Sequence, residues 1–314
     1  MTGVSQPTVP VCYRHPSRET YLRCSRCDRP ICPDCMHDAA VGHRCPDCAN
    51  EGRRNRLQAR TAFGGTLAGQ HGHVTKALIG INVAVFVLTV AIGGAAALGG
   101  SITTGHVWGA MVVGEPGVAF TYPSAPGAAA PGVVNGEFYR LITSMFLHYG
   151  VIHLALNMFA LWVVGGVLEP LLGRARFLAL YLISGIGGSV AVYLTAGLGV
   201  FLFNNPLFGG LATPTAGASG AVFGLFGAFY VVLRRLGRDT SMITAILVIN
   251  LIFTFLVPFI SVAGHLGGLV TGALIAAGLA YAPRKRRTPI QVSALAVIAI
   301  LLIVLTVLRT LALT

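Results

Sequence analysis

Seven apolar stretches, each close to the length needed to cross a bilayer, constrain this chain more than any other feature. An α-helix rises about 1.5 Å per residue, so about 20 apolar residues span the hydrocarbon layer. Only 10% of the residues are charged and the mean hydropathy is +0.75, which is outside the range of ordinary soluble domains. The sequence therefore predicts an all-α polytopic membrane protein with seven transmembrane helices. The stretches are 77–98, 150–168, 177–198, 215–233, 241–259, 262–282 and 290–311.

The connectors between these stretches alternate between basic and nearly neutral. Basic clusters follow the second, fourth and sixth stretches, and the chain before the first is also basic. Because Lys and Arg mark cytosolic loops, we expect a multi-pass protein of the cell membrane with a cytosolic N-terminus and an outside C-terminus. The richness in Gly, Ala and Arg suggests a bacterial source. The clusters are Arg174 and Arg176; Arg234, Arg235 and Arg238; and Arg284, Lys285, Arg286 and Arg287.

The net charge of +12 does not indicate a nucleic-acid partner. Of the 22 Lys and Arg residues, 11 lie before residue 77, where six acidic residues are interleaved with them. Most of the others form the short clusters between apolar stretches, where they act as topology signals. We therefore expect no nucleic acid among the partners.

All seven cysteines lie between residues 12 and 48, in a compact Cys/His-rich head. An odd number of cysteines in close pairs argues against a disulfide framework and for metal binding. Eight ligands suffice for two tetrahedral Zn²⁺ ions, and alternating pairs suggest a cross-brace. His37 and His43 are alternative ligands, and unbound surface cysteines are the alternative interpretation. The first ion would bind Cys12, His15, Cys32 and Cys35, and the second Cys24, Cys27, Cys45 and Cys48.

These features divide the chain into four predicted parts. Residues 1–50 form a cytosolic double-zinc domain similar to a B-box zinc finger, and residues 51–76 are a basic linker. Residues 77–282 form a core of six transmembrane helices, and 283–314 hold a cytosolic basic loop and the seventh helix. Within the core, the Pro/Gly/Ala-rich stretch 123–136 is expected to be poorly ordered.

Ser219 and His265 are the residues most able to carry chemistry. Each opens an apolar stretch that runs from outside to inside under the predicted topology. At about 1.5 Å per residue, Ser219 lies about 22 Å and His265 about 27 Å from the cytosolic ends of their helices, so both fall in the outer half. An ionisable imidazole inside a membrane is a functional-site hypothesis by default. A helix-capping serine and a packing histidine are the structural alternative.

A serine hydroxyl needs a base, and only four acidic residues follow residue 76. None of them is expected beside His265, so a Ser219–His265 dyad is favoured over a triad with a carboxylate. The acidic residues are Glu115, Glu137, Glu169 and Asp239.

A second polar cluster opens the stretch at residue 150. His153 and Asn157 are four residues apart, on one face of the predicted helix and at about the level of Ser219. Such side chains suit the stabilisation of an oxyanion, to which the backbone N–H of Ser219 would add a donor. His148 is expected one turn further out, at the water interface.

Small residues recur every four positions in two stretches. Gly264, Gly268 and Gly272 form one series, and Gly220, Gly224 and Ala228 form the other. This spacing lets helix backbones approach closely, which would bring Ser219 near His265. Packing of the helices alone would explain the pattern equally well.

Taken together, these motifs resemble the rhomboid family of intramembrane serine proteases. Residues 217–220, His265 with Gly268 and Gly272, and His153 with Asn157 follow the family's order over about residues 77–282. Tyr139-Arg140 is similar to the family's Trp-Arg pair, Glu169 to its cytosolic-end glutamate, and the seventh stretch to the extra helix of the six-plus-one form.

The resemblance implies roles for particular residues. Ser219 would be the nucleophile and His265 the general base, with His153, Asn157 and the Ser219 N–H holding the oxyanion. Gly217, Phe223 and Gly264 would support the site, and Phe223 would stack on His265 where many relatives carry tyrosine.

The resemblance also implies substrates and an entry path. Single-span membrane proteins would enter laterally near the second and fifth stretches, and water would reach Ser219 beneath a loop at 258–264. Membrane lipids and a protein partner of the zinc domain complete the expected partners. The alternatives are a catalytically silent relative that binds membrane proteins, and a transporter or channel.

Overall fold

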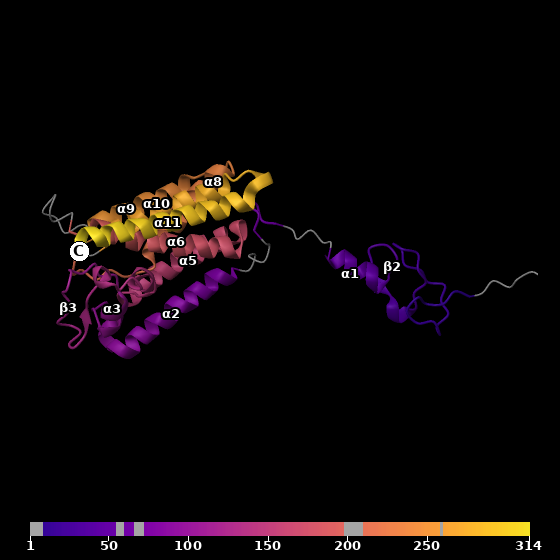
Figure 1. Cartoon of the computed structure of the whole chain (residues 1–314), viewed down its shortest axis with the longest axis horizontal. Helices are drawn as coiled ribbons and strands as arrows, with labels where there is room; N and C mark the ends of the chain where they lie inside the picture. The colour runs from indigo at the N-terminus through magenta and orange to yellow at the C-terminus, as the bar shows by residue number, and fades with distance from the viewer. Residues whose placement is uncertain (1–8, 55–59, 66–71, 198–209, 258–259) are drawn as a thin grey trace, which may run out of the picture. The chain divides into compact units, whose positions relative to one another are not determined.

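The structure is a computed structural model that describes residues 9–54, 60–65, 72–197, 210–257 and 260–314. It divides into two compact units, Met1–Ala59 and Arg60–Thr314, each with its own core (Figure 1). Parts of two predicted features, the connector between the third and fourth stretches and the loop at 258–264, lie outside the described residues.

The first unit is a small fold of turns around a cysteine-rich core. Strands β1 (His37–Asp38) and β2 (His43–Arg44) pair antiparallel, and helix α1 (Pro46–Arg54) follows them. Ile31 is fully buried among six of the cysteines. The ion pairs of this unit are exposed and therefore contribute little to its stability. A unit this small also has few buried apolar contacts to stabilise it.

The second unit is a helical bundle, which confirms the predicted all-α membrane fold. Among the described residues, five helices have the length and composition to cross a membrane, and α9 (Ser241–Leu256) is apolar but shorter. In Figure 1 the long helices run along a common direction. The five are α2 (His73–Gly93), α5 (Gly150–Leu172), α6 (Arg174–Thr195), α10 (Val262–Ala280) and α11 (Arg287–Leu313), which extends the short turn Arg284–Arg286.

Helix α8 (Ser219–Arg235) lies within the bundle and is shorter than predicted. The sequence suggested a start at residue 215, but the helix begins at Ser219 because Thr215 pairs with Met111 and Gly217 adopts a φ of +139°. Nine of its 17 residues are buried against protein. A helix surrounded by other helices does not have to match the thickness of the hydrocarbon layer.

Glycines join α8 to α10 and α6 at backbone contact. A Cβ atom at Gly268 would overlap the carbonyl oxygen of Gly220, and one at Gly272 would overlap that of Gly224. The carbonyl oxygen of Gly264 lies 2.7 Å from the Cβ position of Gly188 on α6. The four-residue spacing of small residues therefore marks a three-helix contact in which side chains have no room.

The outer segment between α2 and α5 is folded, contrary to the expectation for 123–136. It contains α3 (Thr104–Gly109), the paired strands β3 (Phe120–Thr121) and β4 (Ala129–Ala130), and α4 (Arg140–Thr143). The side chain of Asn135 donates to the carbonyl oxygens of Glu115 and Pro131 at 2.7 Å each. Val133 and Val134 are buried and add apolar contacts, which a prediction based on the Pro/Gly content did not anticipate.

Arg140 is the centre of this outer segment and is 1% exposed. Its Nε donates to Glu137 at 2.6 Å, and its Nη1 donates to the carbonyls of Val107 and Ala110. Partial burial would raise the pKa of Glu137, but the Arg140 guanidinium and the Gly132 N–H hold that pKa below its usual value. Three hydrogen bonds, one of them to a carboxylate, therefore compensate the burial of this cation.

Glu169 explains why α2 begins at His73 rather than at residue 77. Its buried carboxylate, near the end of α5, accepts hydrogen bonds from the backbone N–H groups of Val74 (3.0 Å) and Thr75 (2.8 Å). The first N–H groups of a helix have no partner within the helix, and a carboxylate there is stabilised by the helix dipole. This contact ties α2 to α5.

Part of the predicted linker belongs to the bundle. Residues 60–65 form a turn, here called the elbow, in which the Gly65 N–H donates to Thr61 Oγ1 at 2.8 Å. Phe63 is 3% exposed and joins the apolar core of the bundle. Residues 60–65 of the predicted basic linker 51–76 therefore pack on the bundle, because one buried aromatic ring anchors an otherwise polar segment.

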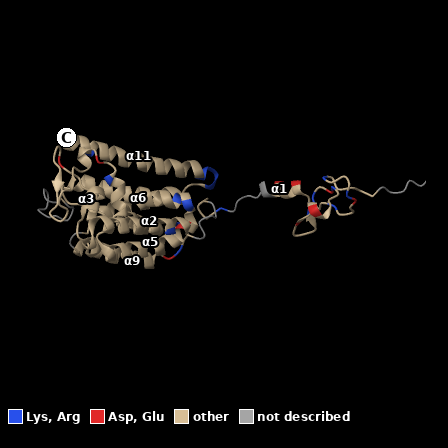
Figure 2. Ribbon diagram, turned by 90° about the horizontal axis from the view of Figure 1, so that it is seen from below, with Lys and Arg blue, Asp and Glu red and all other residues tan. Residues whose placement is uncertain are grey.

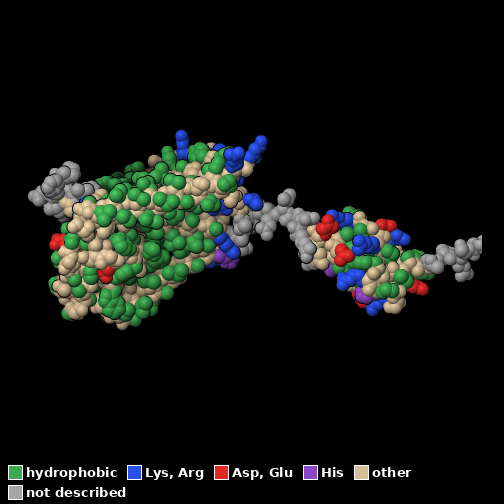
Figure 3. All heavy atoms as spheres, in the orientation of Figure 1, with side chains coloured by type: hydrophobic (Ala, Val, Ile, Leu, Met, Phe, Trp, Pro, Cys, Tyr) green, Lys and Arg blue, Asp and Glu red, His purple; other side chains and the backbone are tan. Residues whose placement is uncertain are grey.

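The charges of the bundle are unevenly distributed. Lys and Arg side chains gather at the end that holds the α8–α9 and α10–α11 connections, whereas apolar atoms cover the long faces (Figures 2 and 3). This is the pattern expected of a protein whose sides face lipid.

A methyl group at the three-helix contact should destabilise the bundle. We expect Gly268→Ala to lower the free energy of unfolding by about 1–3 kcal/mol or more, because the added Cβ forces α10 away from Gly220. Thermal unfolding of the purified chain in detergent measures the change. Gly166→Ala on α5 is the matched control: nothing described lies within 4 Å of its Cβ position, so it should be neutral or slightly stabilising. Equal effects of the two variants would contradict the close contact.

Candidate active site and candidate metal centres

The predicted catalytic residues lie at the beginnings of three helices. Ser219 is the first residue of α8, and His265 and His153 lie in the first turns of α10 and α5. Helix α8 packs against both of the others. Helices that alternate in direction place these three N-termini at one end of the bundle, where their dipoles favour negative charge.

The glycine contact brings the neighbours of Ser219 and His265 together. Gly220, which follows Ser219, has its Cβ position 3.3 Å from the carbonyl oxygen of Gly264, which precedes His265. Ser219 is half-buried and His265 is 8% exposed, so the serine is the more accessible of the two. Phe223 stacks on His265 with ring centroids 4.0 Å apart and planes inclined by 19°.

Thr254 of α9 contacts one ring nitrogen of His265. Its hydroxyl oxygen lies 2.8 Å from the carbonyl oxygen of Asn250 and 2.7 Å from Nδ1 of His265. When the hydroxyl donates its hydrogen to the carbonyl, it accepts from Nδ1, and in that arrangement Nδ1 is the donor. In the neutral ring Nε2 then has a free lone pair, as a general base requires.

His153 has the opposite tautomer by the same reasoning. The backbone N–H of Tyr149 donates to its Nδ1 at 3.3 Å, which leaves the hydrogen on Nε2. A Cβ atom at Gly217 would lie 2.8 Å from this Nε2 and 3.4 Å from Ser219 Oγ. A hydrogen-bond donor and a hydroxyl therefore flank one small space, which the glycine at φ +139° leaves open.

Asn157 lies one turn beyond His153 and is 6% exposed. Its amide nitrogen donates to the carbonyl of His153 at 2.9 Å. A primary amide carries two N–H donors, so one is left after this contact. The first hydrogen bond of α8 runs from Val222 N–H to the carbonyl of Ala218, which leaves the N–H groups of the first turn, including that of Ser219, to other acceptors.

The prediction that His148 sits at the water interface was wrong. His148 is fully buried, and its Nε2 accepts a hydrogen bond from the backbone N–H of Ala218 at 3.4 Å. Its carbonyl contacts Nε2 of His106 at 3.1 Å, and His106 stacks on Tyr149. The outer segment thereby holds Ala218, the residue before Ser219, in place.

Sequence reasoning missed Thr254 and His106 and misplaced His148. Thr254 had a weak signal, since it is one of few polar residues in an apolar stretch. His106 lies in the long connector between the first two stretches and gave no signal, because its contact with the His148 carbonyl joins residues far apart in the chain.

The head brings together the two ligand sets predicted from the sequence. In each set the four ligand atoms lie within 4.8 Å of one another, and His37 and His43 belong to neither. Nδ1 of His15 lies 3.2 Å from Sγ of Cys32 and 3.4 Å from Sγ of Cys35, and the sulfurs of Cys27 and Cys45 are 3.7 Å apart. Ligand sulfurs about 3.8 Å apart suit a tetrahedral ion with bonds of about 2.3 Å, and they are too far apart for a disulfide.

The acid–base properties of these thiols also favour a bound cation. Burial alone would raise the pKa of Cys12, but backbone N–H groups, led by that of Cys32, lower it to about 6. Cys24 has the same balance and a pKa of about 6. Burial and the neighbouring thiols raise the pKa of Cys35 to about 11, and a metal ion would relieve this mutual repulsion. Each set can hold a metal ion.

Similarity to known proteins agrees with the fold. Residues 135–282 match the Rhomboid domain, a region that includes α4 to α10. Rhomboid protease GluP of Bacillus subtilis (strain 168) is 41% identical over 155 residues, covering 47% of this chain and 27% of the relative. The rhomboid-family protein YdcA of the same organism is 38% identical over 149 residues, covering 46% of this chain and 68% of the relative.

Membrane-spanning helices packed around a group of buried polar residues define this chain as a helical membrane-embedded protein. The chain belongs to the rhomboid family. The match spans about a quarter of GluP and about two thirds of YdcA. The chain is also similar to a plant protein named Inactive RHOMBOID-like protein 8, from Arabidopsis thaliana. The two are 34% identical over 161 residues, which cover 49% of this chain and 42% of the relative.

The two ligand sets predict two zinc ions per chain. Elemental analysis of the purified full chain should give two zinc ions, and Cys12→Ser combined with Cys32→Ser should give one, because a site with two missing thiolates binds poorly. His43→Ala removes an imidazole outside both sets and should keep two ions. A zinc content unaffected by the cysteine substitutions would show that the metal binds elsewhere.

Proposed function

We propose that this chain is an intramembrane serine endopeptidase that cleaves membrane proteins with a Ser219–His265 dyad. The observation that carries the proposal is the chain of contacts from the Asn250 carbonyl through the Thr254 hydroxyl to Nδ1 of His265, which can hold the tautomer with an unprotonated Nε2. A histidine that only packs helices does not need this tautomer. Membership of a family that contains named proteases supports the same conclusion.

In the proposed reaction, Ser219 Oγ attacks the carbonyl carbon of a peptide bond while its hydrogen moves to Nε2 of His265. The tetrahedral intermediate carries its negative charge on the former carbonyl oxygen. When the C–N bond breaks, His265 returns the hydrogen to the leaving amine, and an acyl-enzyme remains. Water then adds to the ester by the same route and releases Ser219.

The oxyanion would lie near the space flanked by Gly217. The Nε2–H of His153 and the backbone N–H of Ser219 are donors on two sides of it, and the second N–H of Asn157 is a third. The N-termini of α5, α8 and α10 add a positive potential that requires no charged side chain. This suits a protein with no carboxylate beside His265 among its described residues.

We further propose that the substrates are single-span membrane proteins, cut near the outer face. The alternating basic clusters support a cytosolic N-terminus and an outside C-terminus. A cytosolic head with thiolate ligands also fits the reducing side of a cell membrane. The head is proposed to bind two structural Zn²⁺ ions in a B-box-like cross-brace and to recruit a protein partner.

A catalytically silent protein that binds other membrane proteins is the second candidate. The similarity to a relative named as inactive supports this second candidate. The presence of both Ser219 and His265, with Thr254 in contact with Nδ1 of His265, supports the active form.

Labelling with a fluorophosphonate probe tests the nucleophile. The wild-type chain should be labelled at Ser219, and Ser219→Ala and His265→Ala should abolish labelling, because attack on phosphorus needs the activated hydroxyl. Ser241→Ala, at the exposed start of α9, is the matched control and should label like the wild type. A folded wild-type sample that takes up no probe would favour the silent candidate.

The role of Thr254 gives a second test. Thr254→Val keeps the shape of the side chain but removes the acceptor for Nδ1, so we expect kcat to fall by about tenfold or more with little change in KM. Thr254→Ser should restore most of the rate. Thr306→Val removes a hydroxyl from α11 that bonds to the carbonyl of Leu302, and it should be silent. Cleavage of a single-span substrate in liposomes gives the rates, and unchanged kcat in Thr254→Val would exclude the positioning role.

A further inference from the structure

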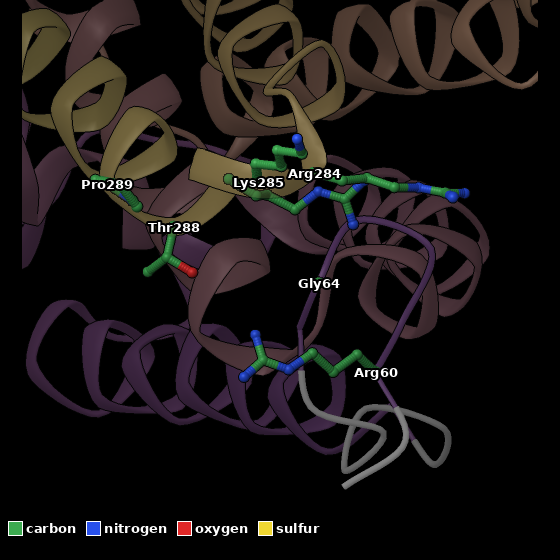
Figure 4. Close-up of a pocket in the computed structure, with 7 residues that line it drawn as sticks. Arg60, Gly64, Arg284, Lys285, Thr288 and Pro289 are labelled. Carbon is green, nitrogen blue, oxygen red and sulfur yellow. The ribbon is translucent and has the colours of Figure 1, made fainter. Parts of the chain in front are cut away.

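A basic pocket lies at the beginning of α11, away from the proposed active site. It is a cavity of about 300 Å³ between the elbow and the α10–α11 turn. In Figure 4, Arg60 reaches in from the elbow toward Thr288, whereas Arg284 and Lys285 lie on the opposite rim with their charged ends directed away from Arg60. The lining residues are Arg60, Gly64, Arg284, Lys285, Arg287, Thr288 and Pro289.

The pocket holds four cationic side chains and no anionic one. All ten Asp and Glu residues of the chain are among the described residues, and none of their ion pairs includes a cation of this pocket. Nε of Arg287 is buried without a hydrogen-bond partner within the described parts of the chain. Arg60 and Arg287 are also near enough to repel Arg176. Like charges held together in this way favour an anion between them.

The pocket is held in place by the bundle rather than by flexible side chains alone. Gln291 is 2% exposed and donates through Nε2 to the carbonyls of Phe63 (3.1 Å) and Leu279 (2.7 Å). Nη1 of Arg287 donates to the carbonyl of Ala62 at 3.1 Å. Gly64, with φ +85°, leaves room for the Arg287 side chain, whose Cδ lies 2.8 Å from its Cβ position. The elbow and α11 therefore form one rigid wall around the cations.

The pocket lies at the start of an apolar helix, which favours a lipid over a soluble molecule as the source of the anion. Thr288 and Pro289 belong to the first turn of α11, and only 17% of that membrane-spanning segment is buried. Exposed Ile290 and Val292 follow directly along the helix. A ligand in the pocket thus has a charged group at the bilayer surface and an apolar helix face beneath it.

We propose that this pocket binds the phosphate group of an anionic phospholipid. The guanidinium groups of Arg60 and Arg287 would contact the phosphate oxygens, and the Thr288 hydroxyl would donate a further hydrogen bond. Lys285, on the rim of the pocket, would add positive charge. The acyl chains would lie against α11. The site fixes the elbow, through which the head is joined to the bundle, and it is independent of the proposed catalysis.

Thermal unfolding of the full chain in detergent micelles tests this site. Short-chain phosphatidylglycerol should raise the unfolding temperature in a saturable manner, and phosphatidylcholine of the same chain length should not. Arg60→Gln combined with Lys285→Gln should weaken the apparent phosphatidylglycerol affinity by about tenfold or more. This pair leaves the Arg287 contact with the elbow intact.

Arg234→Gln combined with Arg238→Gln is the matched control, because it removes two exposed basic side chains that do not line the pocket. It should keep the wild-type affinity. Inorganic phosphate distinguishes the source: if it stabilises the chain as well as phosphatidylglycerol does, and only while Arg60 and Lys285 are present, the pocket is a site for free phosphate. Equal losses in the two double variants, or no response to either anion, would overturn the proposal.

Discussion

The backbone contact between α8 and α10 is the interaction on which the rest of the bundle depends. Gly220, Gly264 and Gly268 let the two helices approach until carbonyl oxygens fill the space that side chains would occupy. The residues next to these glycines are Ser219 and His265, so the packing contact and the proposed dyad are one arrangement. Any side chain that separated the helices would also separate a hydroxyl from an imidazole.

In this site a neutral hydroxyl would orient the histidine, a role that a carboxylate has in a Ser–His–Asp triad. Thr254 contacts Nδ1 of His265 and orients the ring, and its hydroxyl also lies within hydrogen-bond distance of the Asn250 carbonyl. A carboxylate at this depth would have a high desolvation cost and would need a partner of its own. A hydroxyl on a neighbouring helix can orient the ring without that cost. It stabilises an imidazolium less than a carboxylate would.

The sequence predicted what depends on local pattern. Apolar length predicted the membrane helices, glycine spacing predicted the tight contact, and the four paired motifs predicted both ligand sets with their partners. It did not predict the roles of Thr254, His148 or Phe63, because each depends on a contact with a residue far along the chain. The start of α2 was misplaced for the same reason, since the carboxylate that caps it comes from α5. The stretch at 123–136 has a loop-like composition, and its buried valines together with the hydrogen bonds of Asn135 order it.

The capping of α2 by Glu169 has a consequence for any shortened form of this protein. The region that matches the Rhomboid domain starts at residue 135, and the first apolar stretch starts near 77, so either position looks like a reasonable place to cut. Both cuts would remove the N–H donors of Val74 and Thr75 and leave a buried carboxylate bare, a loss that costs several kcal/mol. A stable minimal chain must therefore retain the residues that precede α2, with the elbow included.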